Sequence, residues 1–403
     1  MVPNGWSKQR ISDILERVVK SVKPIEDTYY REIGIRSHGK GIFHKEKVTS
    51  SEIGNKRVFE VIENAFVVNI VFAWEQAIAK TTHEELGFIA SHRFPQFLPK
   101  DGRCDIDYLV YFFKTPKGKY LLELASPGGA GRNKTLGQKE FDRLELVLPP
   151  VPEQRKIAQI LSTWDKAIAT TEKLIDASKQ QKKALMQQLL TGKKRLIDPE
   201  TGKTFGGEWK EVKVGEFGKV VTGNTPPKND DSNYGSDISW ATAEDFKSKY
   251  VGNTKVKLTK LGASKARIVP KGSVLVTCIA SIGKNAIAYE NITTNQQINA
   301  VVINNNHCNE FFYYQIEFNK HKLLAWAGTT AVPILNKSSF EKIPLSASLK
   351  NEQQRIASVL TAADKEIELL EAKLAHFKQE KKALMQQLLT GKRRVKVAET
   401  EAA

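Results

Sequence analysis

Five short stretches of the sequence contain residue types that could support catalysis or phosphate binding. They are HEELG (83–87), GGAGRNK (128–134), TGKTF (201–205), EVK (211–213) and TPPK (225–228). GGAGRNK does not have the spacing of the GxGxxG dinucleotide fingerprint, and GKT lacks a P-loop's first glycine, because Ile197 stands at that position. In HEELG, Gly87 takes the place of the second histidine of the HExxH zinc pattern. These three stretches do not predict a catalytic or cofactor site.

The remaining two stretches and the cysteines do not predict catalysis either. TPPK lacks the acidic or amide residue and the aromatic that flank paired prolines in amino-methyltransferases, and a tripeptide such as EVK is common by chance. Cys104, Cys278 and Cys308 are scattered without CxxC spacing, which argues against a disulfide framework or a zinc site. We therefore predict that the chain is not itself an enzyme and holds no metal or cofactor.

Polar loops carry side chains that could instead bind nucleic acid. Arg, Lys, Asn and Gln pair with base edges and phosphates, and such residues gather in several glycine-rich or polar segments. An ordinary solvated loop is the alternative interpretation for each of them. The candidates are His38, Lys40, Arg93, Arg132, Asn133 and Lys134 in the first half of the chain, and Thr225, Lys228, Ser281, Lys284, Asn285, Asn295, Gln296 and Gln297 in the second.

The overall charge favours an anionic partner. The 403 residues include 62 Lys and Arg against 45 Asp and Glu, which gives a formal net charge of +17, and the excess is spread along the whole chain. Such a basic balance is typical of proteins that bind nucleic acid. The sequence has neither a run of eighteen apolar residues nor an apolar stretch at its start, so we expect a cytoplasmic chain that does not associate with membranes.

A long repeat organises the chain. The twelve residues KKALMQQLLTGK occur at 182–193 and again at 381–392. At this offset of 199 positions, residues 152–196 match residues 351–395 at 24 of 45 positions without a gap. Both copies lack internal Gly or Pro and are rich in Ala, Leu, Lys, Gln and Glu, so each predicts one helix of about 40 residues.

The apolar residues of the two predicted helices follow the alternating three- and four-residue spacing of a coiled coil. We therefore expect the helices to pair along this seam, which Lys381 interrupts in the second copy. Gln187, Gln188, Gln386 and Gln387 lie on the outward face, where the repeated stretch could present one surface twice to two copies of one partner. The main seam residues are Ile157, Leu161, Ile168, Leu185 and Leu189 in the first helix, and Ile356, Leu360, Ile367, Leu370, Leu374, Phe377, Leu384 and Leu388 in the second.

Two segments of similar length precede the helices and share no sustained identity. Both mix short β-rich runs with helical segments and long loops, which indicates α+β globules. The expected architecture is two globular domains that alternate with two long helices paired as an antiparallel coiled coil. The expected boundaries are 1–150 and 197–346 for the globules, 151–196 and 347–395 for the central and distal helices, and 396–403 for a disordered C-terminal tail.

This organisation resembles the specificity subunit of type I restriction-modification systems. LPPVPEQRKIA and NEQQRIA open the two repeats, and KALMQQLLTGK closes both. TGNTPPK, KGSVLVTCIASIGKNAI and TNQQINAVV are similar to a second target-recognition domain of that family, and SPGGAGRNKTLGQKEFDRLELVLPP is similar to the end of a first one. The resemblance covers essentially the whole chain.

The resemblance implies that each globule reads one half of a bipartite, asymmetric double-stranded DNA site in the major groove, and that the helix pair sets the spacing. It also implies that two methyltransferase subunits dock on the helices, and that motor-nuclease subunits join them for cleavage. S-adenosylmethionine and ATP would then be bound by these partners and not by this chain.

A coiled-coil scaffold whose globules bind proteins or other anionic ligands is the alternative from a different class. Duplex DNA binding that weakens steeply with salt separates the two hypotheses, since neutralised phosphates release their counterions.

Overall fold

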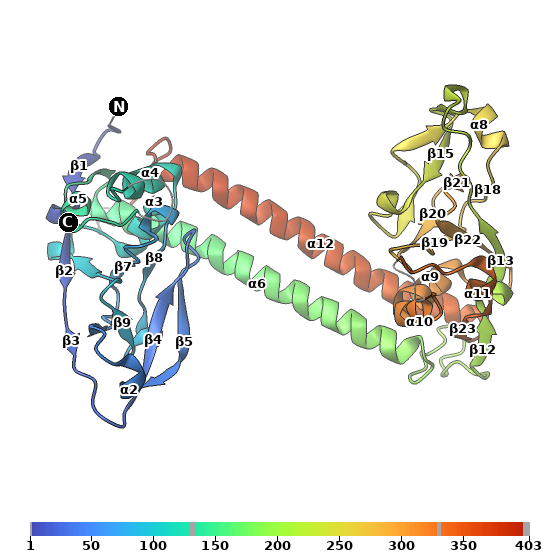
Figure 1. Cartoon of the computed structure of the whole chain (residues 1–403), viewed down its shortest axis with the longest axis horizontal. Coiled ribbons are helices and arrows are strands. Elements are labelled where there is room, and N and C mark those ends of the chain that lie inside the picture. The colour runs from blue at the N-terminus through green and yellow to red at the C-terminus, as the bar shows by residue number, and fades with distance from the viewer. Residues whose placement is uncertain (1, 129–133, 329–331, 398–403) are drawn as a thin grey trace. The chain divides into compact units, whose positions relative to one another are not determined.

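The computed structural model describes residues 2–128, 134–328 and 332–397 (Figure 1). Its internal contacts divide the chain into two compact units. Unit 1 comprises residues 1–172 and 373–403, and unit 2 comprises residues 173–372. Arg132, Asn133 and residues 398–403 of the expected tail lie outside the described residues.

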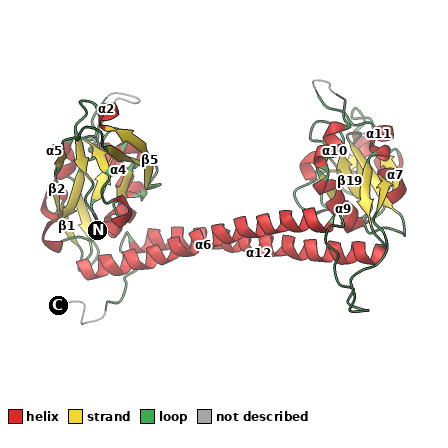
Figure 2. Ribbon diagram, turned by 90° about the horizontal axis from the view of Figure 1, so that it is seen from below, coloured by secondary structure: helices red, strands yellow, loops and turns green. Residues whose placement is uncertain are grey.

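Unit 1 contains the first globule, built on two sheets (Figure 2). One sheet has the strand order β2-β10-β7-β8, the other has β3-β6-β9-β4-β5, and β1 pairs with β11. The strands are β1 Ser7–Arg10, β2 Leu15–Val18, β3 Ser21–Val22, β4 Tyr29–Ile35, β5 Ile42–Thr49, β6 Val58–Glu60, β7 Phe66–Val68, β8 Ile78–Lys80, β9 Ile89–Ser91, β10 Gln96–Pro99 and β11 Glu145–Leu148. The helices are α1 Ile11–Ile14, α2 Ser50–Ile53, α3 Ile106–Phe113, α4 Pro116–Leu124 and α5 Gln138–Asp142, and η1 Ala73–Glu75 is a 3₁₀ turn.

Unit 2 contains the second globule, whose two five-stranded sheets have the orders β13-β22-β19-β20-β16 and β14-β17-β15-β21-β18, while β12 pairs with β23. The strands are β12 Lys210–Lys213, β13 Gly218–Thr222, β14 Tyr234–Gly235, β15 Ile238–Ala241, β16 Tyr250–Val251, β17 Val256–Leu258, β18 Ile268–Val269, β19 Val274–Thr277, β20 Asn285–Ala288, β21 Ile292–Thr294, β22 Ile298–Ile303 and β23 Pro344–Ala347. The helices are α7 Val214–Phe217, α8 Lys260–Ser264, α9 Asn309–Phe318, α10 Lys320–Ala325 and α11 Lys337–Lys342.

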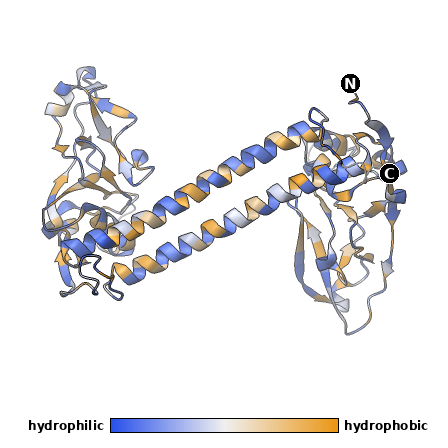
Figure 3. Ribbon diagram, turned by 180° about the vertical axis from the view of Figure 1, so that it is seen from behind, coloured by the Kyte–Doolittle hydropathy of each residue, from blue (hydrophilic) through white to orange (hydrophobic). Residues whose placement is uncertain are grey.

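The two repeats form the long helices α6, Val151–Leu189, and α12, Lys350–Leu388, each of 39 residues. The predicted helix length is therefore confirmed, and so is the predicted α+β class. Apolar and polar residues alternate along both helices, as the coiled-coil spacing requires (Figure 3). Each helix stops shortly before a glycine in the left-handed region, Gly192 at φ +68 and Gly391 at φ +70, where residues with a Cβ are disfavoured.

Each unit takes in parts of both long helices, and each globular core includes residues from both. In unit 1, Ile157 and Leu161 of α6, together with Leu388 of α12, are buried in one cluster with Phe113 and Phe141. In unit 2 the corresponding residues are Ile356 and Leu360 of α12 and Leu189 of α6, which are buried with Phe311, Phe312 and Phe340. The end of each repeated stretch is therefore part of a globular core.

Among the described residues, no helix combines the length and the apolar character that crossing a membrane demands.

Candidate nucleic-acid interface

Three loops of unit 1 are joined by backbone hydrogen bonds. The β7–β8 loop, residues 69–77, lies between the β9–β10 turn and the segment that follows α4. The amide of Ile70 donates to the carbonyl of Arg93 at 3.0 Å, and the amide of Leu136 donates to the carbonyl of Ile70 at 2.8 Å. We call this arrangement the first loop cluster. It holds three segments together that are far apart in the sequence.

Three equivalent loops are joined in the same way in unit 2. The amide of Cys278, in the β19–β20 loop, donates to the carbonyl of Gln297 in the β21–β22 turn at 2.8 Å. The amide of Leu335, in the segment after α10, donates to the carbonyl of Cys278 at 2.8 Å. We call this the second loop cluster. Two globules without sustained sequence identity thus build one loop framework on equivalent strands.

Basic and aromatic side chains line the first loop cluster. Arg93 is exposed in the β9–β10 turn. The Nζ atom of Lys134 lies 5.6 Å from the ring centroid of Trp74, and Phe72 is exposed. A cation on a phosphate or base edge and a planar ring on a base are both common modes of nucleic-acid contact.

The hairpin tip between β4 and β5 adjoins the first loop cluster. The amides of His38 and Gly39 donate to the carbonyls of Glu75 and Gln76, at 2.6 and 2.8 Å, so the tip is fixed on the β7–β8 loop. His38 and Lys40 are exposed there. The structure therefore places the described candidates of the first half, His38, Lys40, Arg93 and Lys134, around one loop.

Amide and hydroxyl side chains line the second loop cluster. Gln296 is exposed, and its Oε1 accepts a hydrogen bond of 2.5 Å from the hydroxyl of Thr225. Asn295 Oδ1 accepts from the amide of Gln297 at 3.1 Å, which fixes the turn that presents Gln296. Ser281 is exposed in the neighbouring β19–β20 loop. Gln296 keeps its side-chain nitrogen as a donor, which suits the edge of an adenine.

Lys228, Lys284 and Asn285 are placed differently from one another. Lys228 is exposed beyond Thr225 on the same loop. Lys284 is half-buried and donates to the carbonyl of Ala243 at 2.6 Å. Asn285 is only 5% exposed, and its side chain donates to the carbonyl of Tyr313 at 2.9 Å. Asn285 therefore supports the interior of the globule, which corrects its selection as a contact residue.

Three residues near these clusters are not among the candidates predicted from the sequence. Phe72 and Trp74 stand in a mainly apolar run of the sequence, and the turn η1 leaves Phe72 exposed and Trp74 half-buried. Arg267 is exposed, and its guanidinium donates to the carbonyl of Thr222 at 2.7 Å, where β13 ends. Nothing in the local sequence distinguishes Arg267 from other solvated cations.

The predicted seam residues are all buried or half-buried. Trp164 and Phe377 pack edge to face, with 5.6 Å between their ring centroids, where α6 and α12 pair in unit 1. The fully or almost fully buried members are Ile157, Leu161, Leu189, Ile356, Leu360, Ile367 and Leu388, and the half-buried members are Ile168, Leu185, Leu370, Leu374, Phe377 and Leu384.

In each unit, a buried carboxylate at the start of one long helix pairs with an arginine from the segment that follows the other helix. In unit 2, Arg195 Nε and Nη2 donate to the two oxygens of Glu352 at 2.6 and 2.9 Å, and the Glu352 side chain is 0% exposed. In unit 1, Arg394 makes the same bidentate pair with Glu153, with both distances 2.7 Å. These residues are related by the repeat offset, so the two pairs are equivalent.

Gln187, Gln188, Gln386 and Gln387 are exposed, as expected for outward positions of the repeated stretch.

Comparison with known proteins agrees with this architecture. The family model described as type I restriction modification DNA specificity domain matches residues 3–180 and again residues 206–379. The putative type I restriction enzyme MjaX specificity subunit of Methanocaldococcus jannaschii is 24% identical, over 98% of this chain and 95% of that protein. The MjaVIII specificity subunit of the same organism is 26% identical, over 98% of this chain and 94% of that protein.

Solved structures share the fold over nearly the full length. The S subunit of a type I restriction-modification system from M. genitalium has a TM-score of 0.58 at 12% identity, with 96% of this chain and 99% of that chain covered. The HsdS subunit from Thermoanaerobacter tengcongensis has a TM-score of 0.54 at 16% identity, with 97% and 98% covered. Because the family model matches well over half of its residues, in two copies that each include one globule and most of one long helix, the chain belongs to the type I restriction modification DNA specificity domain family.

Proposed function

We propose that this chain is the DNA sequence-recognition subunit of a type I restriction-modification complex, in which each globule reads one half of a bipartite, asymmetric site. Residues 1–150 read the first half and residues 197–346 read the second. Its relatives are named specificity subunits, and this chain fills the same role without catalysing the reaction itself. The helix pair of residues 151–196 and 347–395 sets the spacing between the halves.

The observation that supports this proposal most is the duplicated loop framework. Equivalent backbone bonds hold three loops together in both globules, whereas the side chains on these loops differ. Arg93 is exposed and Lys134 is half-buried in the first globule, and Ser281 and Gln296 are exposed in the second. Two domains that recognise different base sequences need different hydrogen-bonding side chains, and these can be presented on the same loop framework. The net charge of +17 adds phosphate attraction that is independent of sequence.

The partners follow from the family and from the repeat. One structural neighbour, with a TM-score of 0.57 at 16% identity, belongs to work on the complex assembly of a type I R-M system. We infer from the family that the partners are methyltransferase and restriction subunits. Two methyltransferase subunits dock, one on each copy of the repeated stretch, and motor-nuclease subunits join for cleavage. A complex of this kind works where the DNA is, so a cytoplasmic location without membrane attachment is part of the proposal.

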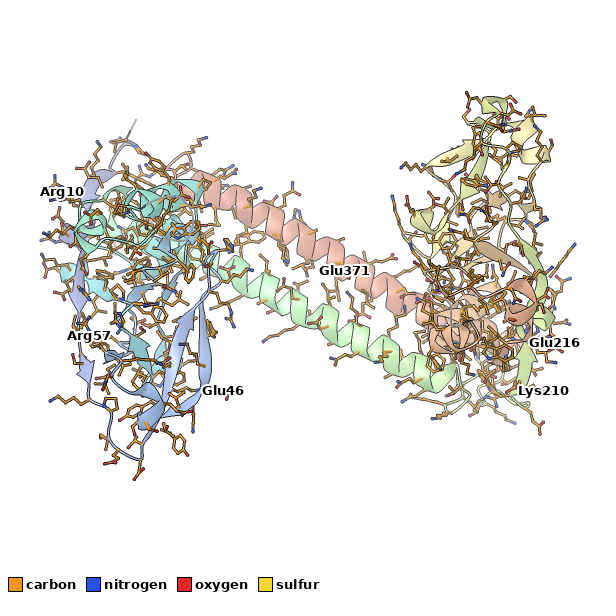
Figure 4. The ribbon with its side chains drawn as sticks, in the orientation of Figure 1. Arg10, Glu46, Arg57, Lys210, Glu216 and Glu371 are labelled. Carbon is orange, nitrogen blue, oxygen red and sulfur yellow. The ribbon has the colours of Figure 1, made fainter. Side chains whose placement is uncertain are left out.

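Substitution of Arg93 or Gln296 by Ala is expected to relax the recognised sequence in one half-site only. Each lost base contact should reduce discrimination at one base pair by about 1–3 kcal/mol. Methylation mapping of a host that carries the variant with its methyltransferase partner measures this. Arg10→Ala, at an exposed position of β1, is the charge-matched control for Arg93 (Figure 4). Variants that altered both halves together, or neither half, would contradict the assignment of one half to each globule.

Replacing the exposed glutamines of one repeated stretch is expected to remove one of the two methyltransferase subunits. Gln187→Ala with Gln188→Ala should give one bound subunit, and adding the same changes at Gln386 and Gln387 should give none. Native mass spectrometry of the reconstituted complex counts the subunits. Gln180→Ala with Gln181→Ala is the matched control, because these exposed glutamines lie just outside the repeated twelve residues. Two bound subunits in the fourfold variant would show that docking uses another surface.

A further inference from the structure

One aspartate in unit 1 joins three segments of the chain. Asp165 of α6 accepts a hydrogen bond of 2.6 Å from the hydroxyl of Tyr111, which belongs to helix α3 of the first globule. Its other carboxylate oxygen pairs with the ammonium of Lys381 on α12. The Lys381 ammonium also lies 5.4 Å from the centroid of the Tyr111 ring. The globule and both long helices thus meet at one carboxylate.

Unit 2 repeats this arrangement. Asp364 of α12 accepts a hydrogen bond of 2.6 Å from the hydroxyl of Tyr314, on helix α9 of the second globule. Its other oxygen pairs with the ammonium of Lys182 on α6, which lies 5.6 Å from the Tyr314 ring centroid. We call each set of Tyr, Asp and Lys a mounting triad. The triads are Tyr111, Asp165 and Lys381 in unit 1, and Tyr314, Asp364 and Lys182 in unit 2.

The triads explain why a lysine opens the repeated stretch. Lys182 and Lys381 are the first residues of its two copies, and Lys381 interrupts the apolar seam predicted from the sequence. Their side chains are only 21% and 17% exposed, and each is neutralised by an aspartate from the other helix. These lysines are therefore internal links and not part of a solvated face.

The two globules also share a tyrosine at the equivalent helix position, although few other residues match. Tyr111 and Tyr314 occupy corresponding positions of α3 and α9, although the two globules share no sustained sequence identity. Burial, together with the hydrogen bond to the aspartate, raises the pKa of each tyrosine, so both hydroxyls remain donors. A hydrogen bond to a charged acceptor is stronger than one between neutral groups.

Each globule adds a second lysine from an unrelated place in its sequence. Lys249 of the second globule donates to the hydroxyl of Thr361 on α12 at 2.6 Å and lies 4.8 Å from the Tyr314 ring centroid. In the first globule, Lys114 lies 5.7 Å from the Tyr111 ring centroid. Burial lowers the pKa of both lysines. A second lysine thus lies beside the tyrosine in each globule, and in the second globule it also binds the helix.

We propose that the two mounting triads fix the orientation of each globule on its helices and thereby make recognition selective for one spacer length. The proposal rests on the proposed function, because it requires two half-sites read at a set separation. If the spacer of a DNA site gains or loses one base pair, one half-site is rotated and shifted relative to the other. Only a globule that tilts on its helix can still reach it, and the triad resists that tilt.

Tyr111→Phe and Tyr314→Phe test this, since each removes only the hydroxyl. The wild-type complex with its methyltransferase partner is first used to map the site. Each variant complex is then offered DNA in which both half-sites are kept and the spacer is shortened or lengthened by one or two base pairs. We expect the preference for the native spacer to fall about tenfold, from the loss of a hydrogen bond to a charged group. The sequence read in each half should stay unchanged.

Tyr120→Phe is the matched control, because Tyr120 is 61% exposed on α4 of the same globule. Lys381→Met, which removes the other donor to Asp165, should act in the same direction as Tyr111→Phe. An unchanged spacer preference in both variants overturns the proposal. So does a change in the half-site sequence itself, which would make Tyr111 part of base reading. Failure of the wild-type complex to methylate any bipartite site would instead overturn the proposed function.

Discussion

A chain that ends after residue 203 is expected to dimerise and to direct methylation to a palindrome. It would contain the first globule and α6, and two copies would present the first globule twice. An antiparallel pair of identical helices has twofold symmetry, so the DNA site should consist of the first half-site and its inverted copy. The full chain should methylate an asymmetric site under the same conditions.

The reason lies in the equivalence of the cross-helix contacts. Unit 1 has three ion pairs that link α6 to α12 or to the segment after it. They are Glu153 with Arg394, Asp165 with Lys381, and Glu172 with Lys378. The residues 199 positions earlier are Arg195, Lys182 and Lys179, which are of the same types. A second copy of residues 151–196 can therefore supply all three partners. Lys182, which stands at the position equivalent to Lys381, would then face Asp165.

The dimer should nevertheless be weaker than the native pairing. Phe377, which packs on Trp164, corresponds to Ser178 in α6. Because Phe377 is half-buried, the loss should be about 1–3 kcal/mol per contact, below the value for a fully buried phenylalanine. Sedimentation of the half-chain gives the dissociation constant.

A charge swap provides the control. Asp165→Lys in the half-chain would set lysine against Lys182 and prevent dimerisation, and Lys182→Asp in the same chain would restore it. A strictly monomeric half-chain, or methylation that stays at the asymmetric site, would contradict this model of the repeat.

Replacement of Arg195 by Ala is expected to destabilise unit 2 strongly. The change leaves the Glu352 carboxylate, whose side chain is 0% exposed, without its bidentate partner. Removal of one member of a buried ion pair costs about 3–5 kcal/mol, because the remaining charge has lost its water and its partner. Arg195 also donates to the carbonyls of Gly206 and Gly207, so the segment between the helix and the second globule should loosen as well.

Urea unfolding, together with hydrogen exchange at the start of α12, measures this effect. Arg10→Ala is the control, because the Arg10 and Glu145 side chains are 61% and 52% exposed and 3.8 Å apart. Such a surface pair contributes about 0–1 kcal/mol. Equal losses from Arg195→Ala and Arg10→Ala would show that burial of Glu352 does not decide the stability of unit 2. Arg195→Met combined with Glu352→Gln should recover part of the loss, since it removes the unpaired charge.

The loop clusters show that the sequence could not predict which loop residues are exposed. Polar residue types in loop segments identified Arg93, Gln296 and their neighbours as candidates, because base edges and phosphates need such donors. The same reasoning selected Asn285, which faces the interior, and passed over Phe72, which does not. Whether a loop residue points outward depends on strand pairing between segments far apart in the chain, and local residue types do not specify that pairing.

The sequence by itself determined the two long helices, their pairing and the alternation with two unlike globules. The repeat has no Gly or Pro between its first residue and the glycine near its end, Gly192 or Gly391, and its apolar residues are spaced by three and four. A long amphipathic helix is the arrangement that buries such an apolar face. Only the tertiary structure decided what the repeated stretch does inside the protein. Leu189 and Leu388 complete globular cores, and Lys182 and Lys381 bind aspartates of the opposite helix. The physical reason is that the helices are antiparallel, so the end of one lies beside the beginning of the other, where a globule is attached.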